Sequence, residues 1–154
     1  MKKENLITSI FSVIILSIIV VGIVIFFIYQ QKWIGIIFVL LGLLHIFVLN
    51  IFGIKTKAVW PDIIFGIIDN GFLVLAAIVG ADFAGVLGAI IGGATANAIT
   101  DGFAGIFEGK TAEYVRKHKI EEKRTALSSS LGKMAGCFFG AGIVLIIMWT
   151  ILSL

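Results

Sequence analysis

Charged residues are scarce in this sequence. Only 14% of its 154 residues are Asp, Glu, Lys or Arg, whereas 60% are hydrophobic. Soluble domains contain about 25% charged and about 45–50% apolar residues. A water-soluble globule of this size could not bury so much apolar surface, which excludes a secreted or cytosolic enzyme. The composition and the mean hydropathy of +1.14 predict a small integral membrane protein.

Cysteine is almost absent as well. The single Cys137 excludes a disulfide framework and every metal motif that needs several cysteines. The net charge of +3 would suit a nucleic-acid partner, but the basic residues lie in loops between apolar runs. We therefore expect no nucleic-acid partner.

Five apolar stretches are long enough to cross a membrane as helices. A hydrocarbon core of about 30 Å needs about 20 helical residues, whereas membrane strands would alternate in polarity over about ten residues. The first stretch is too long for a signal peptide and no small-residue cleavage site follows it. We expect an all-α, polytopic membrane protein with a single domain, residues 1–154, and five transmembrane helices at residues 5–29, 33–54, 61–80, 83–107 and 126–154.

The basic residues are distributed unevenly between the two sides of the membrane. With five crossings, the N-terminus, the loop at 55–60 and the segment 108–125 share one side, and the opposite side carries only Lys32. By the positive-inside rule, the N-terminus lies in the cytoplasm and the C-terminus outside. We expect the cytoplasmic (inner) membrane of a prokaryote. The ten basic residues of the cytoplasmic side are Lys2, Lys3, Lys55, Lys57, Lys110, Arg116, Lys117, Lys119, Lys123 and Arg124.

The cytoplasmic basic segment, residues 108–125, is the only long polar stretch. Residues 110–124 are expected to form a helix that lies against anionic lipid headgroups. The alternative is a solvated linker whose only partner is the lipid bilayer.

Acidic residues lie inside two of the predicted spans. A charge in hydrocarbon is costly, so such residues usually face the interior of the bundle and serve a function. Asp62 lies at the cytoplasmic rim of the third span, and Asp69 lies seven residues deeper, about 10 Å along a helix. The fourth span mirrors this spacing with Glu108 and Asp101. We expect two acidic layers, with Asp62 and Glu108 at the mouth and Asp69 and Asp101 inside.

Neutral and basic side chains lie at about the same level as the inner acidic layer. Oxygen ligands suit a proton or a hard divalent cation, and a histidine shifts the preference toward Mn²⁺ or Fe²⁺. The residues at this level are His45, Asn70, Asn97, Thr100 and Lys133.

Each of these residues also has a structural interpretation. Lys133 can neutralise Asp69 or Asp101 in an ion pair, and the amides and Thr100 can hold helices together by hydrogen bonds. His45 can be a hydrogen-bonded core residue. One lysine can neutralise only one of the two inner carboxylates. A proton or a bound cation must therefore neutralise the other.

Small residues recur at spacings of three and four along the third and fourth spans. This pattern lets membrane helices approach closely, and we expect a tight hairpin that turns near Ala81 and Asp82 and places Asp69 beside Asp101. The small residues are Ala81, Gly85, Gly88, Gly92, Gly93, Ala96, Gly105 and Gly109.

Residues 62–143 resemble the vacuolar iron transporter family. The motifs are Asp69-Asn70-Gly71 before an apolar run, a Gly- and Ala-rich helix that leads to Glu108 or to Ala112-Glu113-Tyr114, and the run from Ala126 to Gly136. The resemblance implies transport of Fe²⁺ or Mn²⁺ against protons. It also implies that Asp69 and either Glu108 or Glu113 lie on the ion pathway.

Two functions follow as hypotheses. The first is a small-cation transporter or channel that needs no cofactor, carries a proton or a divalent cation (Fe, Mn or Mg), and works as a homodimer or higher homo-oligomer. Its candidate metal ligands are Asp69, Asp101, His45 and Glu113. The second is a non-transporting structural or accessory membrane protein with a buried polar cluster. An enzyme ranks below both, because the spans lack the His-rich or Cys-containing sites of membrane hydrolases.

Overall fold

The computed structural model describes residues 6–27, 31–118 and 125–152. All regular structure in these residues is helical, as predicted. The four long helices are α1 (Leu6–Phe27), α2 (Ile34–Ile51), α3 (Trp60–His118) and α4 (Ala126–Leu145), and a π-helical turn, Ile146–Ile151, continues α4. Short 3-10 turns precede α2 and α3, at Gln31–Trp33 and Thr56–Ala58.

Four helices among the described residues are long and apolar enough to span a membrane, which makes the chain an integral membrane protein. The apolar part of α3, Trp60–Phe107, has 48 residues. A straight helix of that length would measure about 72 Å, more than twice the hydrocarbon thickness. The chain avoids this length by folding back on itself.

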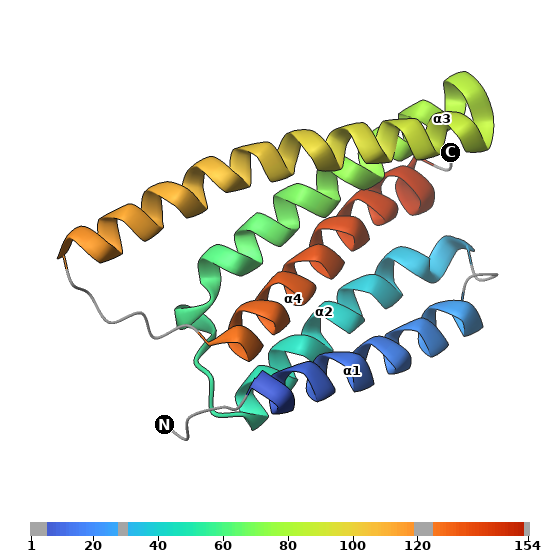
Figure 1. Ribbon diagram of the computed structural model, residues 1–154. Helices are drawn as coiled ribbons and strands as arrows, with labels where there is room; N and C mark the ends of the chain where they lie inside the picture. The colour runs from blue at the N-terminus through green and yellow to red at the C-terminus, as the bar shows by residue number, and fades with distance from the viewer. Residues whose placement is uncertain (1–5, 28–30, 119–124, 153–154) are drawn as a thin grey trace.

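The fold-back divides α3 into two antiparallel arms (Figure 1). Helical dihedral angles are lost only at Ala84 (φ −145°, ψ 25°) and Gly85 (φ 58°, ψ −137°), so residues 60–83 form a first arm and residues 86–118 a second arm. The predicted turn near Ala81 and Asp82 is therefore wrong by three residues. Glycine adopts a positive φ without the steric cost that other residues meet, so the chain reverses at Gly85.

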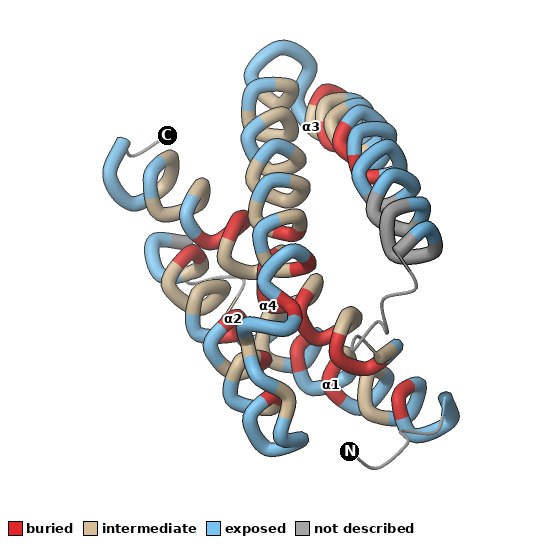
Figure 2. Tube along the Cα trace, turned by 90° about the vertical axis from the view of Figure 1, so that its left-hand side faces the viewer, coloured by how far each residue is buried: buried red, intermediate tan, exposed pale blue. Residues whose placement is uncertain are grey.

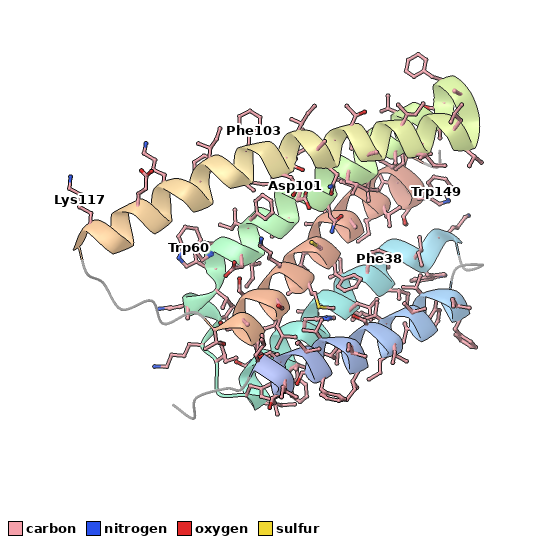
Figure 3. All side chains as sticks on the ribbon, in the orientation of Figure 1. Phe38, Trp60, Asp101, Phe103, Lys117 and Trp149 are labelled. Atoms are coloured by element: carbon pink, nitrogen blue, oxygen red, sulfur yellow. The ribbon has the colours of Figure 1, made fainter. Side chains whose placement is uncertain are left out.

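The second arm also corrects the prediction for the basic segment. We expected the fourth span to end at residue 107 and a separate helix to follow, but α3 continues without a break to His118. The side chain of Lys117, near the end of this arm, is exposed and points away from the other helices (Figure 3). Residues 119–124 of the predicted cytoplasmic helix lie outside the described residues.

Helix α4 is the central element and packs against α1, α2 and the first arm of α3 (Figure 1). Its glycines allow this packing. A Cβ atom on Gly136 would lie 2.1 Å from the Ile63 carbonyl oxygen, and one on Gly140 would lie 2.2 Å from that of Ile67. On the other side, Gly142 faces Gly35 of α2. Backbone-to-backbone contact of this kind drives helix association in membranes.

The buried residues follow this arrangement. Figure 2 shows them concentrated along α4 and the faces turned toward it, whereas the outer sides of α1 and of the second arm are exposed. A hydrophobic core lies where the start of α4 meets α1, α2 and the loop before α3. Its members are Leu16, Leu49, Val59, Leu127 and Leu131.

Candidate functional site

The two arms of α3 meet through a polar contact between Asp69 and Thr100. The Thr100 hydroxyl, which is buried, donates a hydrogen bond to Oδ1 of Asp69. The same hydroxyl lies 3.1 Å from the Ala96 carbonyl oxygen of its own helix. Asp69 is half-buried. A carboxylate on one arm is therefore held by a hydroxyl on the other.

Small residues bring the arms together on the turn side of this contact. A Cβ atom on Gly88 would lie 1.8 Å from the Gly80 carbonyl oxygen, and one on Gly92 would lie 2.2 Å from that of Ala76. The predicted tight hairpin is confirmed at these positions. Farther from the turn, the arms diverge toward their far ends in both views (Figures 1 and 2). Asp69 therefore lies near the point where the arms part.

Asp101 does not join Asp69 in the way the spacing predicts. Its side chain is exposed and accepts a hydrogen bond of 2.9 Å from Nδ2 of Asn97 on the same helix. Successive helical residues point about 100° apart, so the inward position that Thr100 takes leaves Asp101 on the flank of the arm. Figure 3 shows Asp101 and Phe103 on different sides of this arm.

Helix α4 contributes the third side of the polar cluster around Asp69. The Cys137 thiol lies next to the Asn70 side chain and within electrostatic range of Asp69 and Lys133. The Lys133 ammonium lies 5.1 Å from the centre of the Phe65 ring on the first arm. Lys133 and Cys137 are one turn apart on α4, so both face this arm.

Asp62 is not part of an open mouth. Its side chain is only 4% exposed, and its Oδ1 accepts a hydrogen bond of 2.8 Å from the Ser129 hydroxyl of α4. The predicted pairing with Glu108 cannot be followed, because the Glu108 side chain lies outside the described residues. The acid that we expected at the rim is instead buried between the first arm and the first turn of α4.

The first turn of α4 is held by a reciprocal cap. The Thr125 hydroxyl accepts from the Ser128 amide (3.1 Å), and the Ser128 hydroxyl accepts from the Thr125 amide (2.8 Å). Such a capping box satisfies amides that the helix itself leaves without partners. The cap fixes the start of α4 and thereby the position of Ser129 against Asp62.

His45 lies away from the hairpin, between α2 and α4. The ring is fully buried, its Nδ1–H donates to the Leu41 carbonyl oxygen at 2.8 Å, and the ring centre lies 5.2 Å from that of Phe138. Its Nε2 has no hydrogen-bond partner among the described residues. This geometry matches the prediction of a core histidine.

The candidate metal ligands are not gathered into one site. In the part of the chain that the structure describes, no three His, Cys, Asp or Glu side chains lie close enough to hold a metal ion. Glu113 is exposed beyond the apolar part of the second arm, and His45 faces α4. The predicted set of Asp69, Asp101, His45 and Glu113 is therefore dispersed over separate surfaces.

No family model, curated protein or solved structure matches this chain. The resemblance to the vacuolar iron transporter family stays a prediction.

Sequence reasoning did not identify Ser129, Cys137 or three glycines of α4 as contributors to the polar cluster and its supports. Ser129 bonds Asp62, and Cys137 lies next to Asn70. The glycines at 132, 136 and 140 were not recognised as the face that receives the first arm. Their regular spacing of four is the signal that could have identified this face.

Proposed function

We propose that the protein moves a small cation across the membrane and that Asp69 takes up this cation inside the bundle. The supporting observation is the position of Asp69, a half-buried carboxylate in an apolar helix that is hydrogen-bonded to Thr100 where the two arms of α3 part. Ionisable residues within membrane spans are rare and generally mark ion pathways or proton relays.

The proposal assigns five crossings to the chain, two of them by the arms of α3. The fold-back at Gly85 supports two crossings, because it places both ends of the hairpin on one side. The uneven distribution of basic residues supports an N-terminus in the cytoplasm and a location in the cytoplasmic membrane of a prokaryote. Anionic lipid would then meet the exposed Lys110 and Lys117 at the cytoplasmic end of the second arm.

The cation and the hydrogen bond from the Thr100 hydroxyl both use the Asp69 carboxylate. A proton on Asp69 removes the charge that the Thr100 hydroxyl stabilises, and a divalent cation would use Asp69 with the side-chain oxygens of Asn70 and Thr100 as ligands. Uptake of either cation weakens the hydrogen bond between the arms. When no cation is bound, the positive charge of Lys133 on α4 offsets the negative charge of Asp69.

Cation flux into proteoliposomes tests the proposal. We expect the wild type to move at least one of H⁺, Mn²⁺ and Fe²⁺, and Asp69→Asn to reduce that flux by at least about tenfold, the loss expected when a required charge is removed. Asp82→Asn is the matched control, because Asp82 is exposed at the tip of the hairpin. Equal flux in the wild type and in a folded Asp69→Asn protein would overturn the proposal.

A structural or accessory role is the second candidate. The observation that favours it is that Thr100 and Ser129 both bond their carboxylates within the chain, as helix-joining hydrogen bonds do. This role predicts that Asp69→Asn lowers stability and that the wild type shows no flux of the three cations above background.

A further inference from the structure

The loop between α2 and α3 carries two exposed lysines next to an exposed tryptophan. Lys55 and Lys57 are exposed, and Trp60, which follows the loop, is 57% exposed. Residues 52–59 contain no acidic residue. The next acid in the sequence, Asp62, is buried between the first arm and α4. The loop therefore presents positive charge that no acidic residue of the loop offsets, beside an aromatic side chain.

The loop lies at the edge of two apolar spans. One span ends at Ile51 and the next begins at Trp60, so both reach the hydrocarbon boundary close to the loop. Figure 1 shows the loop at the same end of the molecule as the start of α4, and Figure 3 shows Trp60 where the first arm begins. Tryptophan side chains gather at the level of lipid headgroups, and lysine ammonium groups extend to the same level. Phospholipid phosphates are therefore the anions within reach of Lys55 and Lys57.

The backbone of the loop is fixed to the bundle. Val59 is fully buried in the core that also contains Leu127 and Leu131 of α4. The turn between the two lysines is closed by a hydrogen bond of 2.8 Å from the Ala58 amide to the Lys55 carbonyl oxygen. Both lysine side chains therefore start from backbone positions that are set before a ligand binds, which lowers the entropic cost of binding.

We propose that Lys55, Lys57 and Trp60 form a binding site for the headgroup of an anionic phospholipid. The two ammonium groups attract the negative charge, and the indole lies at the boundary between the headgroup and the acyl chains. Attraction to an anionic membrane surface favours binding by about fivefold for each lysine. Phosphatidylcholine has no net charge and gains little from this attraction.

This site is separate from the proposed cation pathway. It requires only that the loop lies at a membrane surface, so a chain that moves no cation would still bind the lipid. It is also separate from the contact of anionic lipid with Lys110 and Lys117, because these residues lie at the far end of the second arm.

Quenching of Trp60 fluorescence by brominated lipid tests the site. The substitutions Trp33→Phe and Trp149→Phe leave Trp60 as the only tryptophan. In bilayers that mix phosphatidylglycerol with phosphatidylcholine, brominating one lipid at a time shows which of them lies beside Trp60. We expect phosphatidylglycerol to be preferred by at least about fivefold at low salt. Equal quenching by the two lipids would overturn the proposal.

Removing charge in the same background identifies the residues responsible. We expect the double variant Lys55→Gln, Lys57→Gln to abolish the preference, and high salt to reduce it in the unsubstituted loop because salt screens exposed charges. Lys32→Gln is the matched control, because Lys32 is exposed at the opposite end of α2, and we expect it to leave the preference unchanged. Asp69→Asn should also keep the preference, which separates this result from the flux measurements. A preference that persists in the double variant would contradict a lipid site at this loop.

Discussion

Thr100 donates a hydrogen bond to Asp69 across the two arms of α3, over a separation of 31 residues in sequence. This contact joins the helices at the level where the sequence predicts an inner acidic layer. It also shows that the layer is a carboxylate with a hydroxyl partner, while the second carboxylate, Asp101, lies on the flank. Asp69 therefore takes part both in the proposed cation pathway and in the contact that stabilises the hairpin.

Replacing Thr100 by valine keeps the shape of the side chain and removes the donor. We expect Thr100→Val to lower the free energy of unfolding by about 1 kcal/mol, the usual size of a hydrogen bond between membrane helices, as measured by SDS titration in mixed micelles. Thr95→Val is the matched control, since Thr95 is exposed on the same arm. Equal stability of the two variants would show that the contact contributes nothing.

A side chain at Gly136 has no room against the first arm. In Gly136→Ala the new Cβ atom would lie 2.1 Å from the Ile63 carbonyl oxygen, so α4 and the first arm must separate. We expect a loss of about 1–3 kcal/mol, as for other overpacked sites, measured by the same titration. Gly22→Ala has open space on α1 and should not destabilise the protein. If the two variants unfold alike, the packing of α4 against α3 is not as described.

The turn of the hairpin depends on the backbone conformation of Gly85. Its φ of 58° is unfavourable for an L-amino acid, and no neighbouring atom lies within 4 Å of its Cβ position. We expect Gly85→Ala to cost about 1–3 kcal/mol through backbone strain alone, because residues other than glycine rarely adopt φ 58° with ψ −137°. Thermal unfolding in detergent, with Gly22→Ala as reference, measures this cost. An unchanged midpoint would argue against a reversal at this residue.

Two adjacent serines of α4 differ in what they bond. Ser129 reaches Asp62 on the first arm, whereas the Ser130 hydroxyl bonds the Ala126 carbonyl oxygen of its own helix. Removing a donor from a buried carboxylate costs about 1–3 kcal/mol, so Ser129→Ala should lower the unfolding midpoint and Ser130→Ala should not. A lower unfolding midpoint for Ser130→Ala than for Ser129→Ala would show that Asp62 does not accept a hydrogen bond from Ser129.

Much of the fold could be predicted from the apolar runs, because their length fixes which segments cross the membrane. The close approach of the two arms also followed from the small residues around Gly88 and Gly92. The position of the reversal did not, since Ala81 and Asp82 keep helical geometry and the chain turns only at the glycine that follows them.

The sequence predicts the height of the candidate residues along the helices but not the direction in which each side chain points. Equal spacing of acids along two antiparallel helices predicts that Asp69 and the residues near Asp101 lie at one height. The rotation of the second arm about its own axis decides whether Thr100 or Asp101 faces the first arm. Contacts at Gly80 and Gly88 set this rotation. The place of His45 depends on the packing of α2 against α4, and no motif in the sequence specifies that packing.

Access of water to position 69 distinguishes a cation pathway from a purely structural contact. The measurement is the rate at which a charged, membrane-impermeant thiosulfonate modifies Asp69→Cys in a Cys137→Ala background, with the neighbouring lipid-facing position, Ile68→Cys, as control. A cation pathway predicts rapid modification at position 69 and none at position 68. An unreactive position 69 in a folded protein would contradict the pathway and leave the contact with Thr100 as a purely structural one.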